Sequence, residues 1–272
     1  MQRKFELPFK HLSITYTVTM ILVIVILPFL VLVYNVATLS LAEIFTIVSD
    51  TRFLNALRLT FLTAFKAATI NIFIGFIIAW ALERYKFWGK GIVDAFIDIP
   101  FALPTSIAGV AITYLYSDRG FLGAILAKFH IKAVYNELGI IIALVFVGLP
   151  FVVRTIQPVI SELDKDVEIA ASFLGASKVQ IFIKITFKII APALVSAFIL
   201  AFARGIGEFG SVVFIAGNIP NLTETLSLLL YIKIEQYNFK EASLIAFVSL
   251  MLSFFIVIAL TIYQKRAIKH VR

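Results

Sequence analysis

The chain has 272 residues, of which 61% are hydrophobic and only 15% are charged, and its mean hydropathy is +1.01. A soluble domain averages about 25% charged residues, so the composition excludes an ordinary soluble fold and indicates a protein whose solvent is largely lipid. The net charge is +8, and the basic residues flank apolar segments. This position is typical of residues that set membrane topology or contact anionic lipid, so it does not indicate binding of nucleic acid.

Six apolar segments are each long enough to cross a bilayer, because about 20 helical residues span its hydrocarbon core. The expected helices lie near residues 13–35, 59–82, 96–116, 137–156, 189–216 and 243–263. The first apolar run is longer than the core of a signal peptide and no A-x-A site follows it, so we expect an uncleaved anchor. The sequence therefore predicts an all-α membrane protein with six transmembrane helices.

Lysine and arginine are distributed unevenly between the two sides of these predicted spans. They gather before the first span, at 84–90, at 154–188 and after the sixth span. Since cytoplasmic loops carry the excess of basic residues, we expect both termini and the loop 157–188 to be cytoplasmic.

Prolines interrupt the third predicted span. Pro100 and Pro104 each remove a backbone donor and disrupt a helical turn. The freed carbonyls need partners or must line a wet cavity, and Thr105 offers a hydroxyl. These three residues are candidates for a translocation path, although prolines also occur in membrane helices as simple kinks.

Charged residues occur inside the fifth predicted span. Arg204 and Glu208 are four residues apart, so they lie on one helical face and can pair. Gly207, Gly210 and Ser211 permit a close approach of another helix. Two interpretations stay open: a structural ion pair that neutralises itself between helices, or a group that lines the path or couples two gate positions.

The segment Gln157–Lys188 is the longest polar stretch on the predicted cytoplasmic side. Two helical pieces, Ser161–Leu174 and one from about Ser177, flank Gly175, which is a plausible left-handed helix stop. The segment is either an interfacial connector resting on lipid or a docking knob for a soluble partner. The candidate docking residues are Glu168, Ile169, Ala170, Ala171, Leu174, Gly175, Ala176 and Ser177.

This loop resembles the EAA loop of the permease subunits of ABC importers, in which Glu-Ala-Ala is followed by Gly, Ile and Leu-Pro at fixed spacings. Ala170-Ala171, Gly175 and Ile185 match the motif. Ile169 stands in place of the glutamate and Phe187-Lys188 in place of Leu-Pro. The small-residue surface of the motif is therefore kept. Glu168 lies one position before the place of the motif's glutamate, so a polar contact of that glutamate stays open.

Further segments are similar to sulfate/thiosulfate permeases of the T type. These segments are IDIPFALPTSIAG (97–109), LVFVGLPFVVRTIQPV (144–159), LDKDVE (163–168), ARGIGEFGSVVFIAGNIP (203–220) and KIEQYNFKEASLIA (233–246). Molybdate and tungstate permeases resemble 233–246 less, so sulfate or thiosulfate is the expected cargo and molybdate or tungstate the alternative.

The resemblance implies a type I ABC importer permease fold with a cytoplasmic EAA-type coupling loop. It implies that residues 1–53 comprise a cytoplasmic N-terminus, the first transmembrane helix and an outer loop. Residues 54–263 would form the transmembrane domain of a type I ABC importer, and residues 264–272 a cytoplasmic basic tail. The membrane would be a bacterial inner (plasma) membrane or a plastid envelope. The expected mechanism is alternating access driven by ATP.

The resemblance also implies partners: a second homologous permease subunit in a heterodimer, two ATPase subunits and a periplasmic or external sulfate-binding protein. The chain carries no Walker A run, so ATP and Mg are expected on the ATPase and no cofactor, metal or catalytic residue on this chain. From other classes, an ATP-independent channel or facilitator remains an alternative. An intramembrane hydrolase would need a second deep acid or a Ser–Lys set, which the spans do not offer.

Overall fold

The computed structural model describes residues 10–269, and every regular element in that range is a helix. The predicted cytoplasmic residues 1–9 and the last three residues of the predicted basic tail lie outside the described residues. The elements are α1 (Lys10–Ile21), η1 (Leu22–Ile26), α2 (Leu27–Ala37), α3 (Leu41–Val48), α4 (Thr51–Arg84), α5 (Lys90–Ile97), α6 (Ile99–Ala102), α7 (Thr105–Tyr116), α8 (Phe121–Ala127), α9 (Glu137–Ser161), α10 (Lys165–Phe173), α11 (Lys178–Ile181), η2 (Phe182–Thr186), α12 (Phe187–Ile206), α13 (Val212–Ala216), α14 (Leu226–Glu235) and α15 (Phe239–Lys269).

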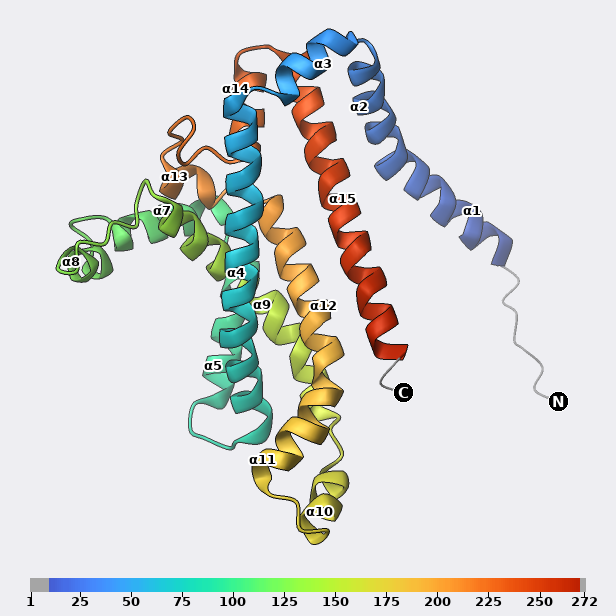
Figure 1. Ribbon diagram of the computed structural model, residues 1–272, viewed down its shortest axis with the longest axis vertical. Coiled ribbons are helices and arrows are strands. Elements are labelled where there is room, and N and C mark those ends of the chain that lie inside the picture. Colours follow the sequence, from blue (N-terminus) through green and yellow to red (C-terminus); the bar gives the residue numbers. More distant parts are fainter. Residues whose placement is uncertain (1–9, 270–272) are drawn as a thin grey trace.

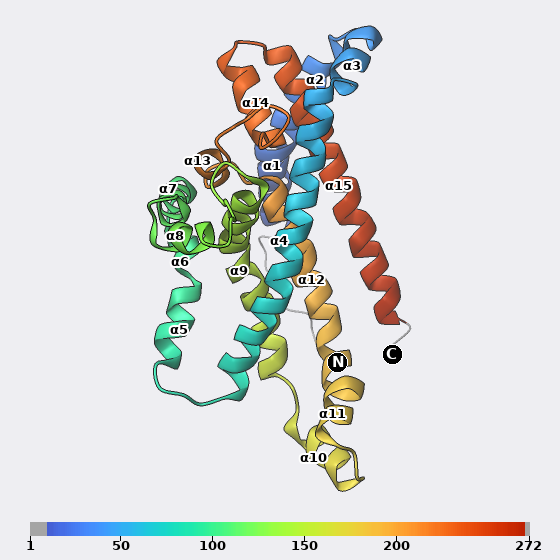
Figure 2. The same cartoon turned by 60° about the vertical axis from the view of Figure 1, so that its left-hand side comes forward.

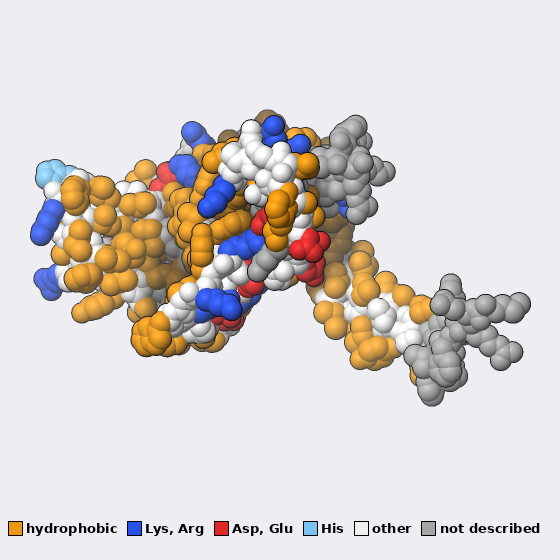
Figure 3. Space-filling model, turned by 90° about the horizontal axis from the view of Figure 1, so that it is seen from below, with side chains coloured by type: hydrophobic (Ala, Val, Ile, Leu, Met, Phe, Trp, Pro, Cys, Tyr) orange, Lys and Arg blue, Asp and Glu red, His pale blue; other side chains and the backbone are white. Residues whose placement is uncertain are grey.

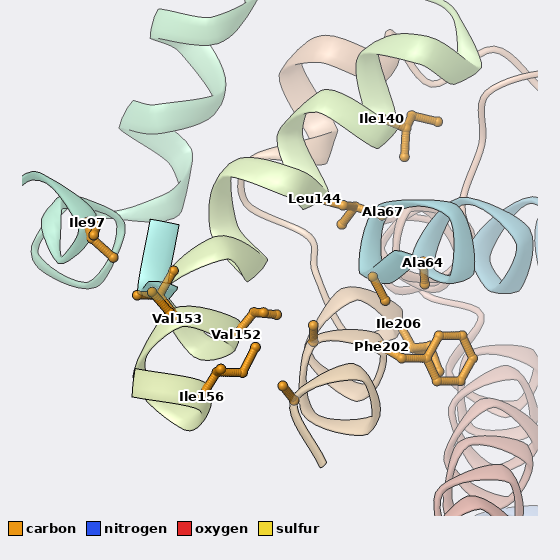
Figure 4. Packing of buried hydrophobic residues seen from close by; sticks show 14 of the residues in the cluster. Ala64, Ala67, Ile97, Ile140, Leu144, Val152, Val153, Ile156, Phe202 and Ile206 are labelled. Carbon is orange, nitrogen blue, oxygen red and sulfur yellow. The ribbon is translucent and has the colours of Figure 1, made fainter. Parts of the chain in front are cut away.

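Three long helices, α4, α9 and α12, pack together as the core of the bundle (Figures 1 and 2). Small residues let them approach closely: a Cβ on Gly75 of α4 would lie 2.6 Å from Cγ1 of Val152 on α9. Figure 4 shows how Ala64 and Ala67 face larger apolar side chains such as Phe202 and Ile206 of α12. Without a hydrophobic driving force in lipid, this close packing is what holds membrane helices together.

The first span, Leu12–Ala37, lies at the edge of the bundle, and none of its apolar window is buried. Its second half, α2, packs against α15, where the rings of Phe29 and Phe247 stack with centroids 6.4 Å apart. Figure 1 shows α1 diverging from the other helices. A bare apolar helix of this length needs lipid or a second protein chain around it.

Five continuous helices of the described chain are long and apolar enough to cross a membrane: the segments Leu12–Ala37, Thr51–Arg84, Glu137–Ser161, Lys178–Ile206 and Phe239–Lys265. A sixth crossing exists only if Lys90–Ala102 and Thr105–Tyr116 count as one span. These two helices meet at 112°. The helix predicted near 96–116 is thus not continuous, and the disruption expected from its prolines is a sharp bend. The bend lies at Pro104, which precedes α7 and has no N–H to continue the helix from α6.

The fifth predicted span is also shorter at its end than expected. We predicted a helix over 189–216, but α12 stops at Ile206 and α13 begins separately at Val212. Three glycines between 205 and 210 weaken the helix at this point, because glycine costs about 1 kcal/mol against alanine in a helix interior. Glu208 consequently lies in the connection that follows the membrane helix, not inside it.

Candidate functional site

The predicted helix-turn-helix is present at one end of the bundle (Figure 2). Helix α10 begins at Lys165, four residues later than expected, because α9 continues to Ser161. The side chain of Asp164 caps it by accepting from the N–H of Asp166. Gly175 follows with φ +84°, the left-handed stop that we predicted, and a capping box at Ser177 starts α11.

The tip of this loop is open and apolar. Phe173 and Leu174 are 88% and 89% exposed, and Ile169 is half exposed. A Cβ on Gly175 would find nothing within 4 Å. Figure 3 views the molecule from this end and shows apolar side chains among basic and acidic ones. The other candidate docking residues, Ala170, Ala171, Ala176 and Ser177, are exposed or partly exposed along the same turn.

Glu168 differs from its neighbours because it faces the bundle. Its carboxylate pairs with the guanidinium of Arg84 at the end of α4, and it accepts a hydrogen bond of 3.0 Å from the hydroxyl of Thr186. Arg84 lies 5.0 Å from the ring of Trp80, which in turn packs edge-on against Phe182. One carboxylate thus connects the loop to both α4 and the segment that leads into α12.

Arg204 and Glu208 form the ion pair that their spacing predicts, with Nη1 and Oε2 2.6 Å apart. The Glu208 side chain is only 2% exposed, and its Oε1 accepts from both the N–H and the hydroxyl of Ser211 at 2.9 Å. Such a carboxylate has no unsatisfied oxygen, so the pair holds the end of α12 against the connection to α13.

The bent segment α6–α7 contacts the connection between α12 and α13, which carries Glu208. Two glycines make this contact possible. A Cβ on Gly109 of α7 would lie 2.6 Å from the carbonyl oxygen of Ser211, and one on Gly210 would lie 2.2 Å from Oγ1 of Thr105. Of the three small residues predicted to permit a close approach, Gly210 and Ser211 make one, whereas nothing lies within 4 Å of a Cβ on Gly207.

Of the proline candidates, one adjoins this group and one does not. Pro104 immediately precedes Thr105 at the start of α7. Pro100 lies in α6, which packs against α9, where the rings of Phe101 and Phe151 meet edge-on. The structure thus gathers Pro104, Thr105, Arg204, Glu208, Gly210 and Ser211, and leaves Pro100 apart.

The sequence reasoning missed an ionic network around Arg154. Its guanidinium donates to both oxygens of Asp98, at 2.9 and 2.6 Å, and to Oδ1 of Asp94 at 2.7 Å. It also donates to Gln157, whose amide reaches Glu83 of α4. The spacing of Asp94 and Asp98, one helical turn apart, was the available signal. The network joins α5 to α9 near the loop end of the bundle.

Two further polar positions were also missed. Asn71 is 1% exposed in the middle of α4, and a Cβ on Gly148 of α9 would lie 2.4 Å from its Nδ2. At the other end of the bundle, Arg52 forms a two-pronged pair with the buried Glu224, both contacts being 2.6 Å. That pair fixes the start of α4 to the loop before α14.

Residues 71–272 match the family of binding-protein-dependent transport system inner membrane components. The chain is 41% identical to the sulfate transport system permease protein CysT of Escherichia coli (strain K12) over 260 residues, which is 96% of this chain and 94% of that protein. It is 43% identical to the probable sulfate transport system permease protein cysT of Zygnema circumcarinatum over 246 residues, 90% of this chain and 85% of that one.

The fold has a counterpart among solved structures. A chain in the crystal structure of a bacterial alginate ABC transporter, in complex with an alginate pentasaccharide-bound periplasmic protein, superposes with a TM-score of 0.75. The match covers 94% of both chains at 16% identity. The helical architecture and the family match agree with the predicted type I permease fold. The chain belongs to the family of binding-protein-dependent transport system inner membrane components, as a multi-pass membrane protein.

Proposed function

We propose that this chain is the permease subunit of an ATP-driven importer that moves sulfate or thiosulfate across a membrane by alternating access. The observation that carries the proposal is the identity of 41% over 96% of the chain with a permease named for sulfate transport. Because the second relative is also named for sulfate, sulfate is favoured over molybdate and tungstate.

The exposed loop around Gly175 is the proposed docking site for an ATPase. Apolar side chains such as Phe173 and Leu174 would be costly to leave in water and fit a groove on a soluble partner. The small residues on the same turn let such a groove close on the backbone. ATP and Mg would be bound by that partner, which would also carry out the hydrolysis.

Movement of the loop would reach the membrane helices through Glu168. Since its carboxylate binds both Arg84 and Thr186, a displacement of α10 would act on α4 and α12 together. The ion pair Arg204–Glu208 and the contact of Gly109 with Ser211 lie at the far end of α12. We assign to this group the role of a gate on the path. ATPase binding and substrate binding would then be coupled through two states of one helix bundle.

The proposed complex contains this chain, a second related permease, two ATPase subunits and an external sulfate-binding protein. The bare first span and the exposed faces of the bundle offer surface for the second permease. Both termini would be cytoplasmic, in a bacterial inner membrane or a plastid envelope.

Two exposed leucines allow a matched test of docking. Leu174→Arg places a charge on the loop tip, whereas Leu41→Arg places the same charge on α3 at the other end of the molecule, where the leucine is 86% exposed. We expect Leu174→Arg to abolish co-purification with the ATPase and Leu41→Arg to leave it unchanged. Equal recovery of the ATPase with both variants would contradict the docking site.

The cargo is tested by uptake of labelled sulfate into cells that lack their own sulfate permeases and express the complete complex. An excess of unlabelled thiosulfate is expected to compete and an equal excess of molybdate is not. Inhibition by molybdate at least as strong as that by thiosulfate would assign the importer to the molybdate class.

A further inference from the structure

A small polar pocket of about 280 Å³ lies at the end of the bundle opposite the coupling loop. It is formed by the first half of α4, the start of α9 and the loop between α13 and α14. Its lining is Asn55, Arg58, Leu59, Leu62, Lys66, Glu137, Asn221 and Leu222. It is separate from the Arg204–Glu208 group, none of whose residues lines it.

The charged side chains of this pocket would be energetically unfavourable in contact with lipid. Arg58 and Lys66 are exposed residues on a membrane-spanning helix, and within residues 10–269 the Arg58 guanidinium has no hydrogen-bond or ion-pair partner. A basic side chain in the hydrocarbon region costs about 2.5–3.5 kcal/mol on insertion scales. This face of α4 therefore lies toward water or toward another subunit, not toward acyl chains.

One wall of the pocket is held in place by the loop. The Nδ2 of Asn55 donates to Oδ1 of Asn221 at 3.2 Å, and Asn221 adopts the left-handed backbone at φ +64° that asparagine tolerates. The two-pronged contact of Arg52 with Glu224 ties the same loop to the start of α4. The pocket is thus preformed and does not depend on a mobile edge.

The electrostatics favour an anion. Lys66 Nζ lies 2.6 Å from Oε1 of Glu137, but the two side chains are 49% and 40% exposed, and an exposed pair of this kind contributes about 0–1 kcal/mol. Counting Arg58, Lys66 and Glu137, the pocket carries a net positive charge. A dianion can therefore compete with Glu137 for Lys66 while it accepts hydrogen bonds from the unpaired guanidinium of Arg58.

We propose that Arg58 and Lys66 form an entry site for a tetrahedral oxyanion dianion, which under the proposed function is sulfate released by the binding protein. Both residues line the same pocket, eight positions and about 12 Å apart along the axis of α4, a separation that two long basic side chains can bridge around a bound anion. Glu137 competes with the anion for Lys66, and the anion is released when the Lys66–Glu137 ion pair forms again. This inference rests on the proposed function and names where its substrate first binds.

The test uses the complete complex, trapped by an ATPase variant that binds ATP without hydrolysing it, and measures equilibrium binding of labelled sulfate. Arg58→Gln is expected to weaken binding by about tenfold or more, the size of one lost charge-assisted hydrogen bond. Arg58→Lys should recover part of the loss. Lys128→Gln removes an exposed charge at the end of α8, which projects away from the pocket, and should bind like the wild type.

Glu137→Gln separates an anion site from a structural ion pair. If Glu137 competes with sulfate for Lys66, its neutralisation tightens sulfate binding, whereas a structural pair would be weakened and binding would fall or stay the same. Arg58→Gln binding equal to Lys128→Gln, or a loss explained by failure of the subunits to co-purify, would overturn the site. If the wild-type complex neither binds nor transports sulfate, the proposed function itself fails.

Discussion

The carboxylate of Glu168 on the exposed loop pairs with the guanidinium of Arg84, which ends the longest helix of the bundle. The pair is partly buried and carries two supports, the hydroxyl of Thr186 and the ring of Trp80. The loop is the proposed docking surface, and this contact between residues 84 positions apart attaches it to the membrane helices.

Removing that attachment is expected to separate ATP hydrolysis from transport. In Arg84→Gln the loop can still dock, but its movement is no longer passed to α4. We expect sulfate uptake in the reconstituted complex to fall by about tenfold while ATP hydrolysis falls much less, because a partly buried charged contact is worth about 1.5–3 kcal/mol. The charge swap Arg84→Glu with Glu168→Arg should recover part of the uptake, and no recovery together with normal assembly would contradict a role for the pair.

The ion pair at the end of α12 predicts a charge-specific loss of stability. Glu208→Gln keeps an acceptor for Ser211 but leaves Arg204 without its counter-charge. Since Arg204 is about one-third exposed, we expect a loss of about 1–3 kcal/mol, less than for a fully buried pair, seen as a lower melting temperature in detergent. The double variant Arg204→Met, Glu208→Gln should be more stable than Glu208→Gln alone. A single variant as stable as the wild type would show that the pair contributes nothing.

Two helical glycines give opposite predictions for the same substitution. Gly109→Ala forces a methyl group to within 2.6–3.0 Å of the Ser211 backbone, which cannot turn aside. We expect it to destabilise the protein by about 1–3 kcal/mol and to lower transport. Gly91→Ala meets nothing within 4 Å on an exposed part of α5, so it should be neutral or stabilise by up to about 1 kcal/mol. Equal melting temperatures for the two variants would refute the close approach of α7 to Ser211.

The network around Arg154 predicts which of its two aspartates contributes more to the stability of the protein. Asp98 accepts two hydrogen bonds from the guanidinium, whereas the carboxylate of Asp94 accepts one from it, so Asp98→Asn should destabilise more than Asp94→Asn by about 1 kcal/mol. Thermal unfolding of both variants in the same detergent measures the difference. The reverse order would mean that the two-pronged contact is not the dominant one.

Much of the membrane architecture could be predicted from composition and local pattern. A run of apolar residues specifies a spanning helix by itself, and Gly175 and the acids before it specify the turn of the loop without tertiary information. The pairing of Arg204 with Glu208 follows from helical spacing alone and is confirmed.

Other features depend on which elements meet in space. Pro100 and Pro104 indicated a disruption, but the 112° bend also depends on the packing of α7 against α13 through Gly109. The apolar pattern predicts a helix that continues past the three glycines near 207, whereas in the structure the helix ends there. The contacts Arg84–Glu168 and Arg154–Asp98 join residues far apart in sequence. The spacing of Asp94 and Asp98 indicates an acidic helix face, but it does not identify Arg154 as the partner.

The proposed function requires that this chain passes sulfate only when an ATPase drives it. Proteoliposomes that contain the complete complex, with sulfate-loaded binding protein on one side and ATP on the other, measure this directly as accumulation of labelled sulfate. We expect uptake that stops without ATP, without the ATPase or with the Leu174→Arg variant. Sulfate flux through this chain and its permease partner in vesicles that lack the ATPase would contradict it and would identify a channel or facilitator.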